Sequence, residues 1–229
     1  MRKIKNYFTG FEIVLWMSSV IVITFSYFFF DGKDILTFIA SIIGATFLIF
    51  NAKGNPIGQF LTIIFSIMYG IISYRFAYYG EMITYLGMTM PMACFALISW
   101  LKNPYNNNKA QVKVNKLSKK EYAFMVVLTV VVTVAFYFVL KTFNTANLIF
   151  STLSVTTSFI AVYLTFKRSS FFALAYACND IVLIILWILA TLKDNSYFSV
   201  VICFFVFLVN DIYGFISWIK MENNQRLCN

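Results

Sequence analysis

The chain has 229 residues, of which 61% are apolar, 20% are aromatic and only 12% are charged. About a quarter of the residues in a soluble domain are charged, so this composition excludes a water-soluble globular protein. The net charge of +9 is not arranged as a basic stripe with interleaved aromatic residues, which excludes nucleic acid as an expected partner.

The apolar residues form long runs, and a run of about 18 or more residues can cross a bilayer as a helix. The first run follows Arg2, Lys3 and Lys5, which is the outline of a signal peptide. The run is too long for one and no small-residue cleavage site follows it, so we expect a transmembrane helix. In chain order, the runs predict spans near 12–30, 34–50, 56–78, 82–101, 122–141, 147–166, 170–192 and 196–220.

The loops between these runs differ in charge. Cytoplasmic loops of membrane proteins carry an excess of Lys and Arg. We therefore expect a multi-pass protein of the cell (plasma) membrane, in contact with the lipid bilayer and with both termini in the cytoplasm. This orientation places all but four of the 18 basic residues on the cytoplasmic side, the four being Lys33, Arg75, Lys141 and Lys193.

Two parts of the chain resemble each other. Ile98-Ser99-Trp100 aligns with Ile216-Ser217-Trp218, and the hydropathy of the flanking segments matches. The pattern predicts an all-α membrane protein with two parallel three-helix repeats and an additional N-terminal helix, and transporters built in this way bind substrate between the repeats. We expect one membrane domain over 1–229, with repeat one at about 34–101, a cytoplasmic linker at 102–121, a linker helix at 122–141 and repeat two at about 147–220.

Polar residues inside apolar spans are rare and usually face a cavity or a partner. The seventh span contains Asn179-Asp180, with Trp187 two turns beyond Asp180, and the eighth contains Asn210-Asp211 followed by Tyr213. Amides, carboxylates and aromatic faces together suit a flat cationic ring that carries hydrogen-bonding groups. The alternative is structural: the two aspartates pair with hydroxyl groups or with Arg75 and hold helices together.

Two other spans carry weaker signals. Gln59, Ser66 and Tyr69 share one face of the third span, and we include Gln59 and Tyr69 among the candidate binding residues, although solvation at the interface is the ordinary explanation for Gln59. Trp16, Trp100 and Trp218 lie at span ends, which is typical of anchors at the membrane interface. The sixth span has a hydroxyl stripe of a kind that more often bonds helix to helix: Ser151, Ser154, Ser158 and Thr165.

Several kinds of chemistry are excluded. No glycine-rich loop ends in Gly-Lys-Ser or Gly-Lys-Thr, so ATP binding of the P-loop type is not expected. The chain has no histidine, which removes Ser-His-Asp and histidine-metal arrangements. Its four cysteines lack metal-ligand spacing, so we expect no metal, no cofactor and no enzymatic activity. They are Cys94, Cys178, Cys203 and Cys228.

Several short motifs occur in a recognisable order: Tyr79-Gly80-Glu81-Met82, Trp100, Asn179-Asp180, and Asn210-Asp211-Ile212-Tyr213-Gly214 ahead of Trp218. In these motifs the chain resembles the Pnu-type vitamin transporters, among which are importers of nicotinamide riboside, and the resemblance extends from about residue 36 to 221. It implies a three-plus-one-plus-three helix fold related to the sugar-transporting SWEET proteins. It also implies facilitated diffusion of nicotinamide riboside, a precursor for NAD biosynthesis, which a cytoplasmic kinase then traps.

The resemblance also implies roles for the candidate residues. Nicotinamide riboside carries a carboxamide on a cationic pyridinium joined to a ribose. Such a ligand needs amide partners, a counter-charge and flanking aromatic rings. We expect Asn179 and Asn210 to bond the carboxamide or ribose. The rings of Trp187, Tyr213 and Tyr69 would flank the pyridinium ring. Asp180 and Asp211 would balance its charge or fix the amides.

One departure from the family pattern bears on the substrate. Many members place two tryptophans three residues apart at the start of the helix that carries Asn179, whereas this chain has Phe172 and Ala175 at these positions. Thiamine, another cationic heteroaromatic vitamin, is therefore the competing substrate. A non-transporting membrane scaffold and an intramembrane enzyme acting on lipid are further alternatives. A homo-oligomer is left open as a form of assembly.

Overall fold

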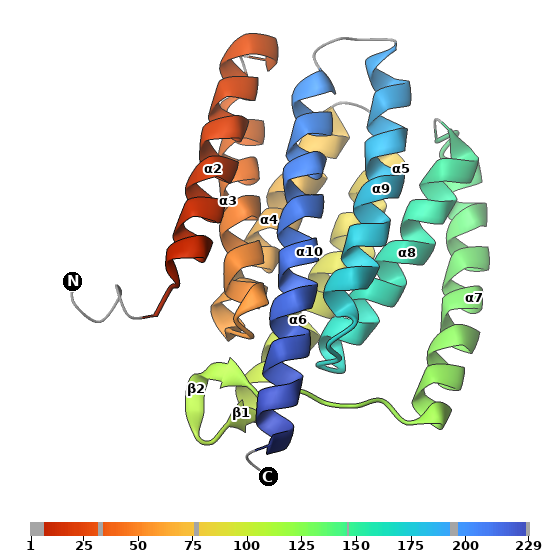
Figure 1. Cartoon of the computed structure of the whole chain (residues 1–229). Coiled ribbons are helices and arrows are strands. Elements are labelled where there is room, and N and C mark those ends of the chain that lie inside the picture. Colours follow the sequence, from red (N-terminus) through yellow and green to blue (C-terminus); the bar gives the residue numbers. More distant parts are fainter. Residues whose placement is uncertain (1–6, 32–33, 76–77, 146, 193–196, 228–229) are drawn as a thin grey trace.

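The computed structural model describes residues 7–31, 34–75, 78–145, 147–192 and 197–227 and is built almost entirely of helices (Figure 1). Within these residues, eight helical segments are long and apolar enough to cross a membrane, as predicted. The expectations for Arg2, Lys3, Lys5, Lys33, Lys193 and Cys228 fall outside the described residues. The helices are α2 (Gly10–Ser26), α3 (Ile35–Ala52), α4 (Pro56–Arg75), α5 (Tyr79–Thr84), α6 (Met90–Lys102), α7 (Lys119–Thr142), α8 (Leu148–Phe166), α9 (Phe172–Thr191) and α10 (Phe198–Leu227).

The fourth span is interrupted by a π-helical turn, Tyr85–Thr89, which joins α5 to α6. Pro91 follows in the first turn of α6, where its missing N–H removes one backbone hydrogen bond of a regular helix. π-Helical turns of this kind often occur at functional sites. Here the turn supplies Tyr85 and Thr89 to the central cavity of the bundle.

The predicted duplication is visible in how the helices pack. In repeat one α4 contacts both α3 and α6, and in repeat two α9 contacts both α8 and α10. The repeats meet along two equivalent contacts, α3 with α10 and α6 with α8. The linker helix α7 lies at the edge of the bundle beside α8, and α2 lies at the opposite edge beside α3 (Figure 1).

Two tryptophans bond the repeats to each other. The Trp218 indole N–H donates to the carbonyl of Asn51 at 2.7 Å, and that of Trp100 donates to the carbonyl of Thr165 at 2.9 Å. Both carbonyls lie in the last turn of the first helix of the opposite repeat, where backbone oxygens lack helical partners. The expectation of an interfacial anchor is wrong for Trp100 and Trp218, because these side chains are only 1% and 0% exposed.

The helices that precede the repeats are also equivalent. Glu12 near the start of α2 binds Lys53 at 3.1 Å, and Glu121 near the start of α7 binds Lys167 at 3.0 Å. Each glutamate completes a capping box at the start of its own helix. Each lysine directly follows the first helix of a repeat. The equivalence of the two halves therefore includes α2 and α7.

The linker contains a short β-hairpin, β1 (Pro104–Tyr105) and β2 (Asn108–Val112). Asn106 and Asn107 both have positive φ, a backbone conformation that asparagine adopts more readily than most residues. Val112 at the end of β2 is fully buried, and its N–H donates to the Gly54 carbonyl at 2.9 Å. The hairpin thus caps one end of the bundle, which we call the hairpin end; the opposite end is the far end.

Candidate functional site

A central cavity lies between the two repeats, with about 40 Å³ of space for water-sized molecules. Its walls come from α3 and α4, the π-helical turn, α8, α9 and α10. They combine aromatic rings with amide, hydroxyl and carboxyl groups, and none of the described lining residues is basic. The polar lining residues are Asn51, Thr62, Tyr85, Thr89, Ser158, Tyr176, Asn179, Asp180 and Asp211.

Asn179 lies on α9 and is 3% exposed. Its Oδ1 accepts hydrogen bonds from the hydroxyls of Thr157 at 2.8 Å and Ser158 at 2.9 Å, both on α8. Two donors on one oxygen fix the orientation of the amide and leave its NH₂ group as the part available to a ligand. Two members of the hydroxyl stripe of α8 bond to another helix: Ser158 orients Asn179 in the cavity wall, and Ser154 donates to Glu81 on α5 at 3.3 Å.

Asp180 on α9 and Asp211 on α10 bring two carboxyl groups to the cavity, and they are only 4% and 5% exposed. The two carboxyl groups lie close enough to interact with each other. Among the described residues, Asp180 Oδ2 has no hydrogen-bond partner of ordinary geometry. Arg75, the suggested structural partner, instead lies 3.9 Å from Asp34 and is largely exposed. Arg75 therefore does not pair with Asp180 or Asp211 to hold helices together, as the structural alternative suggested.

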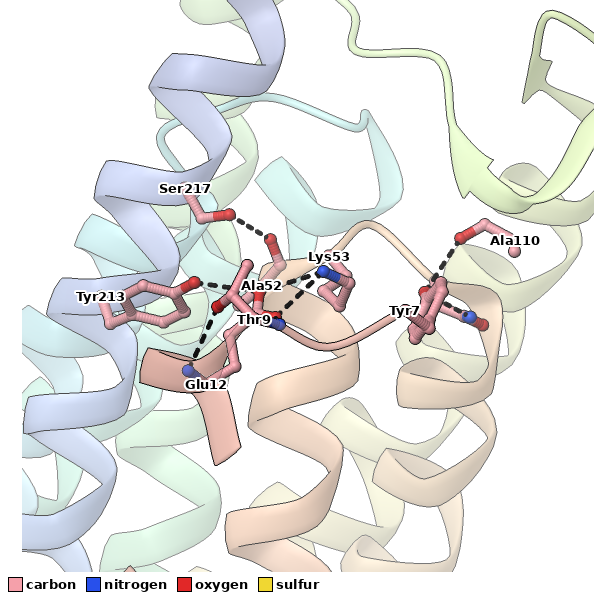
Figure 2. Close-up of polar contacts among 9 residues, drawn as sticks. Tyr7, Thr9, Glu12, Ala52, Lys53, Ala110, Tyr213 and Ser217 are labelled. Carbon is pink, nitrogen blue, oxygen red and sulfur yellow. Dashed lines mark hydrogen bonds and ion pairs between the residues drawn. The ribbon is translucent and has the colours of Figure 1, made fainter. Parts of the chain in front are cut away.

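Two of the candidate residues on α10 face away from the cavity. Asn210 donates from Nδ2 to the Ser19 hydroxyl on α2 at 2.9 Å. Tyr213 donates its hydroxyl to Glu12 at 2.9 Å, on the α2 side of the bundle (Figure 2). Successive helical residues point about 100° apart, so Tyr213 and Asp211 cannot face the same space. The structure therefore places Asn210 and Tyr213 outside this cavity, and their contact with a ligand stays a prediction.

Gln59 is also placed differently from the expectation. It is 2% exposed rather than solvated, and its side-chain NH₂ donates to Asn51 Oδ1 at 2.9 Å. Gln59 does not line the cavity, whereas Asn51 does. Gln59 thus contacts the cavity only indirectly, through its hydrogen bond to the side-chain amide of Asn51.

Tyr69 and Trp187 line a second, smaller cavity toward the far end of the bundle, with about 10 Å³ of space for water-sized molecules. We call it the outer cavity. Phe65, Phe204 and Phe207 line both cavities and separate them. The eight candidate residues are therefore divided: Asn179, Asp180 and Asp211 share the central cavity, Tyr69 and Trp187 share the outer one, and three lie elsewhere.

Several residues of the central cavity are absent from the sequence prediction. Phe172 and Tyr176 lie seven and three positions before Asn179, and Tyr176 lies four positions before Asp180. This helical spacing was the signal that could have identified them. Asn51 was a second signal, because it is an amide at the end of an apolar run.

Comparisons with known proteins agree with this architecture. A family profile described as "Nicotinamide mononucleotide transporter" matches residues 34–220. The nicotinamide riboside transporter PnuC of Neisseria mucosa is 25% identical over 158 residues, which are 67% of this chain and 60% of that protein. The crystal structure of a protein named vitamin B3 transporter PnuC matches with a TM-score of 0.83 and 23% identity, over 95% of this chain and 94% of that one.

The matched segment of the N. mucosa protein is less than two thirds of its length, and the crystal structure shows a common fold. The proteins that match are described as transporters, in agreement with the expectation that this chain is not an enzyme. Its eight apolar helices make it a multi-pass membrane protein. On the match over residues 34–220, the chain belongs to the nicotinamide mononucleotide transporter family.

Proposed function

We propose that this protein imports nicotinamide riboside by facilitated diffusion, through the central cavity between its repeats. The observation that supports this most strongly is the charge of the cavity. Asp180 and Asp211 are both buried in its wall, and no lysine or arginine is among the lining residues that the structure describes. A buried carboxyl pair favours a cationic ligand, because an opposite charge nearby stabilises the charged form of both groups.

The same observation distinguishes the riboside from its phosphorylated form. Nicotinamide mononucleotide carries a phosphate, a group with a charge of about −1.5 to −2 at neutral pH. A phosphate in this cavity would be buried beside two carboxyl groups without a basic partner, and buried charges without a partner are strongly unfavourable. We therefore assign the unphosphorylated riboside as substrate, although the family description refers to the mononucleotide.

The remaining groups of the cavity suit the rest of the riboside. The Asn179 amide complements a carboxamide, and the rings of Phe172, Tyr176 and Tyr85 offer aromatic faces to a pyridinium. The available space of about 40 Å³ is small beside the roughly 300–1,000 Å³ of pockets that hold drug-sized ligands. Binding therefore requires the repeats to separate, as alternating access between repeats would do.

Passive import with cytoplasmic trapping is the mode of transport that we propose. The sequence has no P-loop motif to couple ATP hydrolysis to movement. Phosphorylation inside the cell would give a product that this acidic cavity disfavours, so it would not leave by the same route. We place the hairpin end and both termini in the cytoplasm of a plasma-membrane protein; the single-domain organisation and a homo-oligomer stay predictions.

Thiamine is a second candidate substrate, and one observation favours it. Of the two positions at which the family resemblance leads us to expect tryptophan, Phe172 lines the cavity, but Ala175 offers no ring. A cavity with fewer flanking rings has weaker contacts with a pyridinium, while its negative charge attracts either vitamin.

Uptake into liposomes that contain the purified protein tests these assignments. We expect saturable uptake of labelled nicotinamide riboside that excess unlabelled riboside blocks and nicotinamide mononucleotide does not. Empty liposomes and the Asn179→Ala variant are the controls. Block by mononucleotide as strong as by riboside would contradict the charge argument, and uptake of thiamine without riboside would reassign the substrate.

A further inference from the structure

The outer cavity belongs to a column of aromatic rings that leads from the far end of the bundle to the central cavity. Tyr78 lies 4.9 Å from Trp187, measured between ring centroids, and Trp187 lies 6.5 Å from Tyr69. Tyr69 in turn lies 4.4 Å from Tyr85, which lines the central cavity. These distances lie within the usual range for interacting aromatic rings.

Two polar atoms in this column lack normal hydrogen bonds. Tyr69 is 6% exposed and Trp187 is 1% exposed. Neither the Tyr69 hydroxyl nor the Trp187 indole N–H has a hydrogen-bond partner of ordinary geometry among the described residues, although the two groups lie close enough to influence each other. Both residues line the outer cavity. Buried polar groups are nearly always bonded, so two adjacent unpaired donors beside one cavity indicate a missing acceptor.

Three phenylalanines separate this cavity from the central one. Phe65, Phe204 and Phe207 line both cavities. The ring of Phe207 lies 5.8 Å from that of Phe65 and 5.7 Å from that of Phe204, measured between ring centroids. Phe207 also packs directly onto the backbone of Gly44 in α3. A solute that moves between the cavities must displace these rings.

We propose that the outer cavity is a second binding subsite for the same planar cation, occupied before it passes the phenylalanines. Tyr69 and Trp187 would donate hydrogen bonds to an acceptor oxygen of the solute, and the rings of Tyr69, Trp187, Phe65 and Phe204 would face its cationic ring. This subsite rests on the proposed function, because it acts on the same substrate. It differs from the central cavity in having aromatic faces and donors but no carboxyl group among its described lining residues.

A native cysteine allows this subsite to be probed directly. Cys203 lines the outer cavity and does not line the central one. In a background with Cys94→Ser, Cys178→Ser and Cys228→Ser, it would be the one remaining thiol. A small cationic methanethiosulfonate reagent applied to liposomes of known orientation then reports access to this cavity, and nicotinamide riboside should slow the labelling.

The decisive comparison is between variants of the two cavities. Tyr69→Phe and Trp187→Phe each remove one hydrogen-bond donor and keep an aromatic ring. Each should raise the riboside concentration that half-protects Cys203 from labelling by roughly three- to tenfold, the loss expected for one hydrogen bond. Asp211→Asn, a change in the central cavity, should keep the riboside concentration that half-protects Cys203 within about twofold of the wild-type value. Tyr163→Phe, which removes the hydroxyl of a buried tyrosine outside both cavities, is the matched control and should change nothing.

The outcomes separate this inference from the proposed function. One outcome would overturn the outer subsite alone. In it, the wild-type protein takes up riboside, protection of Cys203 is lost in Asp211→Asn, and protection is unchanged in Tyr69→Phe and Trp187→Phe. Uptake without any labelling of Cys203 would also overturn it, because the cavity would then lie off the path. Failure of the wild-type protein both to take up riboside and to be protected by it would overturn the subsite and the proposed function together.

Discussion

The indole rings of Trp100 and Trp218 lie 5.4 Å apart, and each donates its N–H to a backbone carbonyl in the opposite repeat. The adjacent serines repeat the pattern, because Ser217 donates to the Ala52 carbonyl and Ser99 to the Phe166 carbonyl. One Ser-Trp pair from each repeat therefore closes the hairpin end of the inter-repeat contact.

Trp218→Phe should destabilise the protein by about 0.5–1.5 kcal/mol, the net contribution of one hydrogen bond. It removes the indole N–H from the buried carbonyl of Asn51, which keeps the Gly54 N–H as a donor. The expected sign is a lower melting temperature in detergent, and Trp100→Phe should act in the same direction. Trp16→Phe is the matched control, since Trp16 is 36% exposed and its N–H bonds a side chain rather than a helix end. Equal effects at all three positions would argue against a special role for the inter-repeat bonds.

Gly44→Ala should impair folding and transport, because the new Cβ would lie 2.1 Å from Cζ of Phe207. Overpacking of this kind typically costs about 1–3 kcal/mol. The smaller side chain in Phe207→Leu should partly rescue Gly44→Ala in thermal melting, as contacting residues couple. Gly87→Ala is the control, since its nearest neighbour would be 3.8 Å away. Additive effects of Gly44→Ala and Phe207→Leu would contradict the contact.

Asp211→Asn should reduce riboside uptake by about tenfold or more, equivalent to roughly 1.4 kcal/mol of lost cation stabilisation. The substitution keeps the size of the side chain but removes its ability to carry negative charge. Uptake of the reduced riboside, whose ring is uncharged, should fall less. Asp34→Asn, which changes an aspartate at the start of α3 outside the cavity, controls for general effects of lost charge. Equal losses for the charged and uncharged forms would show that Asp211 does not recognise the cation.

The two equivalent ion pairs should differ in strength. Glu12 is 3% exposed and Lys53 18%, whereas Glu121 and Lys167 are 34% and 28% exposed. Lys53→Met leaves a buried carboxylate with fewer partners and should cost about 1–3 kcal/mol. Lys167→Met should cost less than about 1 kcal/mol, as for other solvent-exposed pairs. Melting temperatures of both variants measure the difference, and a larger effect of Lys167→Met would contradict this ranking.

The sequence was sufficient for the spans and the duplication, because both depend on long apolar runs and on one repeated motif. The Ile-Ser-Trp motif identified the repeat but not its purpose. Aromatic residues at span ends usually face the lipid interface, and nothing in the local sequence shows that Trp100 and Trp218 instead reach across to the other repeat.

The site was predicted less completely, since adjacent polar residues on a helix face different neighbours. Asp211 faces the cavity while Asn210 bonds Ser19 on α2, and only the packing of α2 against α10 decides this. Tyr85 and Thr89 enter the cavity from a π-helical turn, whose register a regular helical pattern does not describe.

The most direct test of the central claim is an experimental structure of the protein with nicotinamide riboside bound. The account predicts the pyridinium in the central cavity, within about 4–6 Å of the carboxyl groups of Asp180 and Asp211, and the carboxamide beside Asn179. A riboside bound with its ring away from both aspartates, or outside the space between the repeats, would contradict it.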